Sequence, residues 1–184
     1  MHFALFDTAI GCCGIVWSAR GVVGVQLPET SAAATRARLR KRYPDASEAV
    51  APADIQQAIG DATALLAGEQ RDLSSIVIDD SAIPEFNRRV YAVARRIPPG
   101  QTMTYGEVAE RLGDKRLARE VGQAMSENPT PIIMPCHRVL AANGKPGGFS
   151  ATGGVMTKLQ LLSIENAQPS GPTLFERLPL AVRR

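Results

Sequence analysis

Short apolar runs rich in β-branched residues alternate with polar turns over the first part of the chain. Runs of this length and composition are typical of strands, and Ala19-Arg20-Gly21 between the second and third runs suits a hairpin turn. Two longer segments have the pattern of helices. We therefore expect a small α+β unit at the N-terminus. Its predicted strands are residues 2–7, 13–18, 21–27 and 75–78, and its predicted helices are residues 31–42 and 53–66.

A polar break, Asp79-Asp80-Ser81, separates this unit from a second part in which helical periodicity dominates. Pro84 lies in the first turn of the next helix, where its missing N–H group costs little. Pro98-Pro99-Gly100 ends that helix. Its expected core stripe consists of Phe86, Val90, Val93 and Ile97. We therefore divide the chain into residues 1–80, residues 81–166 and a C-terminal tail at residues 167–184.

Two short helices are predicted next along the chain. Thr104-Tyr105-Gly106-Glu107 matches a capping box, in which the Thr104 hydroxyl and the Glu107 side chain each accept from the other residue's amide. Gly113 suits the position after the end of this helix. Asp114 can cap the second helix, residues 115–126. Two short helices joined by a turn that contains glycine indicate a helix-turn-helix.

The second of these helices has two unlike faces. The apolar face consists of Leu117, Val121, Ala124 and Met125. The opposite face is small, polar and basic, and it consists of Lys115, Ala118, Arg119, Gly122 and Ser126. A glycine in mid-helix costs about 1 kcal/mol relative to alanine. Gly122 therefore indicates a close approach of the helix backbone, either to an external surface or to a neighbouring helix.

Pro135-Cys136-His137-Arg138-Val139 follows a short apolar run, and we expect Cys136 to be a reactive thiol at the end of a buried strand. A thiolate near neutral pH needs a base or a positive charge beside it. His137 is the only plausible imidazole, since His2 lies at the start of the chain. Adjacent strand residues face opposite ways, so a bridging water or a turn is needed to connect the pair. Glu165 is the candidate carboxylate to orient the imidazole. The alternative is a buried structural cysteine beside a surface histidine.

Charge is distributed unevenly along the 184 residues, whose net charge is +3. Residues 1–80 hold seven Lys and Arg against ten Asp and Glu, whereas residues 81–184 hold fourteen against eight. A basic second half is typical of a nucleic-acid-binding protein, although scattered surface charge is the alternative.

We see no run of apolar residues long enough to cross a membrane and no signal peptide. Three cysteines form no disulfide framework, which favours the cytoplasm.

Four motifs in order resemble the O6-alkylguanine-DNA alkyltransferase family (methylated-DNA–protein-cysteine methyltransferases). They are Thr104-Tyr105-Gly106-Glu107, Ala118-Arg119-x-Val121-Gly122, Asn128-Pro129-x-Pro131 and Pro135-Cys136-His137-Arg138-Val139. The resemblance covers residues 83–166. It implies a mostly helical C-terminal domain and, in outline only, a ribonuclease-H-like α+β domain before it. It also implies repair of O6-alkylguanine, and of O4-alkylthymine, in double-stranded DNA. The protein is expected to be a monomer that needs no metal or cofactor and has no membrane partner.

The resemblance further implies a role for individual residues. Cys136 would take the alkyl group irreversibly from a flipped-out base, with His137 and Glu165 as its proton relay and Asn128 as a brace. Arg119 would fill the gap in the duplex, and Tyr105 would press on the flanking phosphate and donate toward the base. The remaining DNA contacts would come from Ala118, Gly122, Lys115 and Thr104. The substrate pocket would be lined by Val139, Phe149, Ser150, Met125 and Pro131.

Some residues depart from the family pattern. Phe149 replaces a tyrosine, Met134 a small β-branched residue and Tyr91 a tryptophan. Glu120 is acidic where a small residue is usual, and it has the spacing to pair with Arg116. The loop at residues 150–154 is two residues longer than usual, and Cys12, Cys13 and His2 form no convincing metal site. The alternatives to alkyl transfer are a non-catalytic reader of alkylated DNA, a cysteine hydrolase and a transcription regulator.

Overall fold

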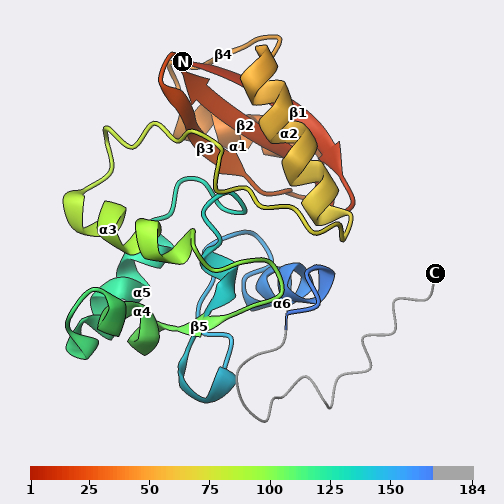
Figure 1. Ribbon diagram of the computed structural model, residues 1–184. Coiled ribbons are helices and arrows are strands. Elements are labelled where there is room, and N and C mark those ends of the chain that lie inside the picture. Colours follow the sequence, from red (N-terminus) through yellow and green to blue (C-terminus); the bar gives the residue numbers. More distant parts are fainter. Residues whose placement is uncertain (168–184) are drawn as a thin grey trace.

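The computed structural model describes residues 1–167, which combine an N-terminal sheet with a mostly helical second half (Figure 1). The expected tail therefore lies, beyond Ala167, outside the described residues. The N-terminal elements are β1 (His2–Thr8), β2 (Gly11–Ser18), β3 (Gly21–Gln26), α1 (Ala32–Arg42), β4 (Ser47–Glu48) and α2 (Ala53–Leu66). The sheet order is β3-β2-β1-β4, with β4 parallel to β1 and the other pairs antiparallel. The predicted α+β class is thus confirmed.

The strand predicted at residues 75–78 is wrong. Only one isolated bridge, between Val22 and Ile78, joins this segment to the sheet. Residues 73–76 form a turn instead, in which the Ile76 amide donates to the Leu73 carbonyl at 3.2 Å and the Arg95 guanidinium donates to the carbonyls of Ser74 and Ile76, each at 2.7 Å. Carbonyls that bond a side chain are lost to a strand ladder. The sheet's fourth strand is instead β4, whose two exposed polar residues give no alternating pattern to predict from.

The second half begins with three helices, α3, α4 and α5, that closely follow the predicted ones. The elements of the whole second half are α3 (Glu85–Ala94), β5 (Met103–Thr104), α4 (Tyr105–Arg111), η1 (Lys115–Leu117), α5 (Ala118–Ser126), η2 (Cys136–Arg138), β6 (Val139–Leu140), η3 (Ala142–Gly144) and α6 (Val155–Ile164). The capping box of Thr104 and Glu107 is present, and Gly113 has φ +103°. Asp114 caps η1, so the second predicted helix begins with a 3₁₀ turn. The Tyr91 hydroxyl donates to the Ala124 carbonyl at 2.8 Å and fixes α3 on α5.

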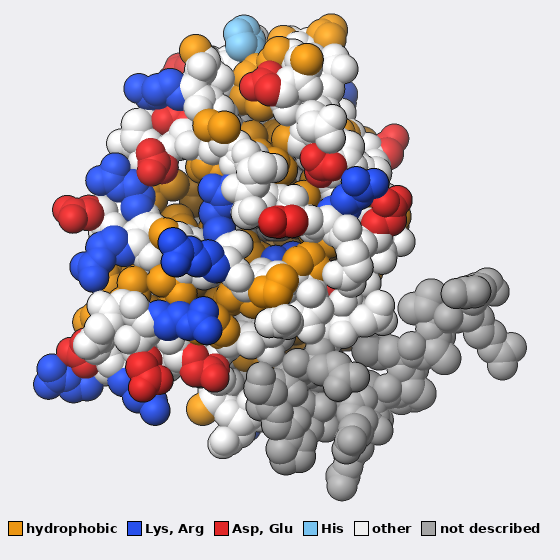
Figure 2. Space-filling model, viewed as in Figure 1, with side chains coloured by type: hydrophobic (Ala, Val, Ile, Leu, Met, Phe, Trp, Pro, Cys, Tyr) orange, Lys and Arg blue, Asp and Glu red, His pale blue; other side chains and the backbone are white. Residues whose placement is uncertain are grey.

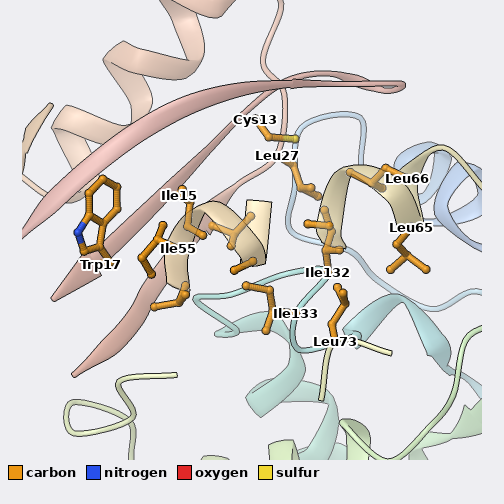
Figure 3. Packing of buried hydrophobic residues seen from close by; sticks show 14 of the residues in the cluster. Cys13, Ile15, Trp17, Leu27, Ile55, Leu65, Leu66, Leu73, Ile132 and Ile133 are labelled. Atoms are coloured by element: carbon orange, nitrogen blue, oxygen red, sulfur yellow. The ribbon is translucent and has the colours of Figure 1, made fainter. Parts of the chain in front are cut away.

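Two hydrophobic clusters hold these elements together. One lies between the sheet and α2, and Figure 3 shows Ile132 and Ile133 of the second half inserted beside Leu27 and Leu73. The other packs α3, α4 and α5 around Cys136. Phe149 contacts both clusters. The first core is therefore completed by residues from the second half of the chain. Among residues 1–167, no helix combines the length and apolar character needed to span a bilayer.

Candidate active site

The segment that presents Cys136 is a tight turn, so the prediction of a buried strand there is wrong. Ile132 has φ +77°, and the Met134 amide donates to the Thr130 carbonyl at 2.8 Å. Prolines before and after the apolar run lack N–H donors and restrict the backbone, which prevents a ladder. Cys136 is the first residue of the 3₁₀ helix η2. Its neighbours are buried because the turn enters both cores, which is why they resemble a strand in the sequence.

Asn128 braces this turn with every polar atom of its side chain. Its amide nitrogen donates to the Met134 carbonyl at 2.9 Å and to Cys136 Sγ at 3.2 Å. Its Oδ1 accepts from the Thr130 amide at 2.9 Å. The side chain is buried, so each bond replaces one that water would otherwise make. Asn128 thereby sets both the shape of the turn and the environment of the sulfur.

Behind the sulfur lies a buried charged cluster. His137 Nε2 lies 2.9 Å from Glu165 Oε1, and Arg138 donates to both Glu165 oxygens at 2.8 Å. Burial opposes ionisation of Glu165, but the bonds from His137 and Arg138 prevail and lower its pKa to about 2. Burial lowers the pKa of His137, which favours the neutral imidazole. Its Nδ1 is buried and has no partner among residues 1–167. The predicted relay pair is thus brought together, with Arg138 as a third member.

Lys158 is a buried charge that sequence reasoning missed. Its Nζ donates to the Val139 carbonyl at 2.6 Å and lies 5.7 Å from the centre of the Tyr105 ring. Burial raises the pKa of the Cys136 thiol, while the Asn128 donor and the Lys158 charge lower it. Burial also lowers the pKa of Lys158 to about 8. A signal for it exists in the sequence, because it shares a helical stripe with Leu161, Leu162 and Glu165.

A pocket of about 240 Å³ opens at the sulfur. The second half of the chain lines it with Cys136, Asn128, Pro131, Phe149, Ser150 and neighbouring residues. The Ser150 hydroxyl donates to the Ser126 carbonyl at 3.1 Å. Three predicted pocket residues therefore lie around the thiol. The other two, Met125 and Val139, pack in the hydrophobic cluster that contains Cys136 and do not line this pocket.

The predicted DNA-reading residues lie on α4, η1 and α5. Lys115 and Arg119 are exposed, and Ala118 and Gly122 are partly exposed on the same helical pair. A Cβ added at Gly122 would meet nothing within 4 Å, which removes the alternative of a tight contact with a neighbouring helix. Thr104 caps α4. Figure 2 shows exposed Lys and Arg side chains interspersed with Asp and Glu side chains at the lower left of the view, where Figure 1 places these helices.

Arg116 and Tyr105 also lie on this helical pair. Arg116 pairs with Asp114 at 2.9 Å and not with Glu120, because the cap residue before η1 is the nearer carboxylate. Tyr105 begins α4 and is half-buried, and burial raises the pKa of its hydroxyl. A phenol with a raised pKa keeps its proton at neutral pH and can donate it as a hydrogen bond.

Comparisons with known proteins point to one family. The sequence model described as "6-O-methylguanine DNA methyltransferase, DNA binding domain" matches residues 85–167. The methylated-DNA–protein-cysteine methyltransferase of Methanothermobacter thermautotrophicus is 34% identical over 86% of this chain and 81% of its own length. The Mycobacterium tuberculosis protein OGT, solved in complex with DNA, is 30% identical with a TM-score of 0.73 over 90% of this chain and 93% of its own. The O6-methylguanine-DNA methyltransferase of Pyrococcus kodakaraensis is 25% identical, with a TM-score of 0.71 over 90% and 99%.

Proposed function

The chain belongs to the methylated-DNA–protein-cysteine methyltransferase family, and from this we propose that Cys136 accepts alkyl groups from O6-alkylguanine, and from O4-alkylthymine, in duplex DNA. Its activity is DNA repair by transfer of an alkyl group to one of its own cysteines. One observation carries the choice of cysteine. Asn128 donates to Cys136 Sγ at 3.2 Å at the wall of a pocket, whereas Cys12 and Cys13 do not line it.

The reaction we propose is a single displacement at the alkyl carbon. The Sγ–carbon bond forms as the bond from that carbon to guanine O6 breaks, and the bonding electron pair leaves with the guanine. The leaving base then takes a proton, and the hydrogen bond that Tyr105 donates helps it to depart. The product is a thioether, which has no leaving group for the reverse step. Each molecule therefore acts once.

The thiol proton is removed through His137 in this scheme. Nε2 of the neutral imidazole donates to Glu165, so Nδ1 is the acceptor. A water between the thiol and Nδ1 would carry the proton and satisfy a buried nitrogen that otherwise has no partner among residues 1–167. Glu165 then stabilises the imidazolium that forms, as a carboxylate does in related nucleophile–histidine pairs. Lys158 stabilises the thiolate by its charge.

For the base, we propose that the pocket of Pro131, Phe149 and Ser150 holds the extruded nucleobase. Met125 and Val139 support this pocket from the core behind Cys136. Base extrusion is the only route by which an enzyme reaches a target atom inside a duplex. Phe149 supplies an apolar ring face, and Ser150 supplies a hydroxyl at the rim. The longer loop that carries Ser150 adjusts the contacts with the base edge.

For the duplex, we propose that α4 and α5 act as a helix-turn-helix in the minor groove. Arg119 replaces the extruded base in the stack, while Tyr105, Lys115 and Thr104 hold the flanking phosphates. Ala118 and Gly122 keep the helix slim for a groove about 6 Å wide. We further propose a ribonuclease-H-like domain at residues 1–80, a catalytic domain at residues 81–166, and a monomer in the cytoplasm, where reducing conditions suit a free thiol.

The test is a stoichiometric transfer assay on duplex DNA that carries O6-methylguanine, followed by mass mapping of the protein. One methyl group per molecule on the Cys136 peptide is expected, and none with Cys136→Ser. Repeated turnover would indicate a hydrolase. Tight binding of the alkylated duplex without a change in protein mass would indicate a non-catalytic reader. Either result would overturn the proposal.

A further inference from the structure

Helix α1 carries two pairs of arginines that face in different directions. Positions four apart share a helix face, whereas positions two apart are separated by about 200°. Arg36 and Arg40 form one pair, and both contact Glu48, at 3.0 and 3.7 Å. Arg38 and Arg42 form the other pair and have no carboxylate partner among residues 1–167. Arg42 lies over the Tyr43 ring at 5.4 Å.

The unpaired arginines line the pocket that holds Cys136. The N-terminal half forms one wall of this pocket, and both Arg38 and Arg42 belong to that wall. The second half of the chain lines the same pocket with Cys136, Pro131 and Ser150. The part of an O6 substituent that lies beyond the attacked carbon needs space next to the sulfur. The residues proposed to hold the base are Pro131, Phe149 and Ser150, so the wall that α1 contributes has no proposed contact with the base.

The other charged groups of the pocket already have partners. Glu29 accepts from the Thr152 hydroxyl at 2.7 Å and from the Gln26 amide at 3.2 Å. Glu127 accepts from Asn87 at 2.9 Å and from Gln123 at 3.2 Å. Both carboxylates therefore bond neutral donors and form no ion pair with Arg38 or Arg42. The two guanidinium groups can bind an anion that enters the pocket. A guanidinium offers a planar set of donors that matches a carboxylate.

We propose that Arg38 and Arg42 form a subsite for a negatively charged group at the far end of an O6 substituent, with O6-carboxymethylguanine as the simplest substrate. This inference rests on the proposed function of Cys136. The same guanidinium chemistry would also bind a DNA phosphate, and the experiment separates the two sources.

The reaction at this substrate is the same displacement. Sγ bonds to the methylene carbon as the carbon–O6 bond breaks, and the electron pair leaves with guanine, which takes up a proton. The thiol proton passes to His137. The product is S-carboxymethylcysteine at position 136, and no oxidant or second substrate is consumed. The carboxylate keeps its charge throughout, so its contact with the arginines forms on binding and persists in the transition state.

The experiment compares second-order rate constants for the single turnover, measured below saturation, where binding contributes to the rate, on three duplexes of one sequence. They carry O6-methylguanine, O6-carboxymethylguanine or the neutral near-isostere O6-carbamoylmethylguanine. The proteins are the wild type, Arg38→Gln, Arg42→Gln, the double variant and the control Arg40→Gln, which changes an arginine of the same helix outside the pocket. We expect the double variant to lose about tenfold in rate on the carboxymethyl duplex, as for one charge-assisted hydrogen bond. Rates on the other two duplexes should change less than about twofold.

Each other outcome counts against the subsite. An equal loss on all three duplexes, with a reduced dependence on salt, would assign the arginines to a DNA phosphate. No change on any duplex would show that they bind neither group. Failure of the wild type to methylate Cys136 would instead overturn the proposed function, and the subsite with it. Normal methyl transfer with an unchanged carboxymethyl rate in the double variant would overturn the subsite alone.

Discussion

The positive charge of Lys158 lowers the pKa of the Cys136 thiol. Replacing it in Lys158→Met removes the ammonium that lowers the thiol pKa, so less thiolate forms at neutral pH. We expect the transfer rate at pH 7 to fall about tenfold, which corresponds to about one pKa unit. The ammonium loses its proton above about pH 8, so the rise of the wild-type rate with pH should become shallower there.

The measurement is the pH profile of the single-turnover rate, because damage to the fold alone lowers a rate without moving the profile. Lys145→Met changes an exposed lysine of the loop after β6 and serves as the control. In Lys158→Met the rise of the rate should move to higher pH, and it should not become shallower near pH 8. An unmoved profile would rule out an electrostatic role for Lys158.

Glu165 links the relay to the stability of the fold. Its pKa of about 2 in the folded protein is below its value in the unfolded chain, about 4.3. The carboxylate therefore contributes stability that is fully present above about pH 4.3 and is lost as pH falls through about 2. In Glu165→Gln the buried Arg138 loses its charged partner, and we expect the free energy of unfolding at pH 7 to fall by about 3–5 kcal/mol.

Urea unfolding at neutral and acid pH tests this linkage. The difference between the wild type and Glu165→Gln should shrink as the pH approaches 2. The exposed Glu110→Gln is the control and should follow the wild type. A difference that stays constant with pH would mean that Glu165 acts only through packing.

At the scale of elements, α5 offers a change that should separate folding from DNA binding. The site of Gly122 is open, so Gly122→Ala fits the free protein and stabilises the helix by about 1 kcal/mol or less. The same methyl group would obstruct the groove if this face approaches DNA. We therefore expect higher thermal stability and weaker duplex binding from one substitution.

Gly60 provides a matched control. It lies in the middle of α2, and an added Cβ there also meets nothing within 4 Å. Gly60→Ala should give the same gain in stability and leave duplex binding unchanged, as measured by fluorescence anisotropy. Equal binding by both variants would remove Gly122 from the DNA-reading face.

Periodicity and capping chemistry were enough to predict β1 to β3 and α1 to α5, including the Thr104–Glu107 box and the cap at Asp114, but not the two-residue strands β4, β5 and β6. They were not enough at residues 75–78 or at Ile132, where a distant guanidinium or a proline-bounded turn decides the backbone. Arg95 lies about 20 residues along the chain from the segment it bonds, and the turn at Ile132 is buried because it packs in both cores, which imitates a strand in the sequence. The pairing of His137 with Glu165 was predicted from their residue types, whereas the bonds of Arg138 and Lys158 were not predicted and depend on packing.

At the scale of the whole molecule, the shared core predicts that both halves unfold together. Ile132 and Ile133 fill the core beneath the sheet, so neither half buries its apolar surface alone. Trp17, the sole tryptophan, lies in β2 and reports on the sheet. Circular dichroism reports mainly on the helices. We expect the thermal transitions of the two signals to coincide. Separate midpoints would show two independent units.

Burial of the Cys136 sulfur affects how long a molecule keeps its thiol unmodified before it binds damaged DNA. Cys136 is only 7% exposed, and its pKa is raised by burial, so small electrophiles and oxidants in the cell meet a shielded, protonated thiol. A protein that can react only once loses its purpose if its sulfur is capped by a stray reagent. Burial therefore protects the nucleophile from side reactions until the protein binds a duplex that carries an alkylated base.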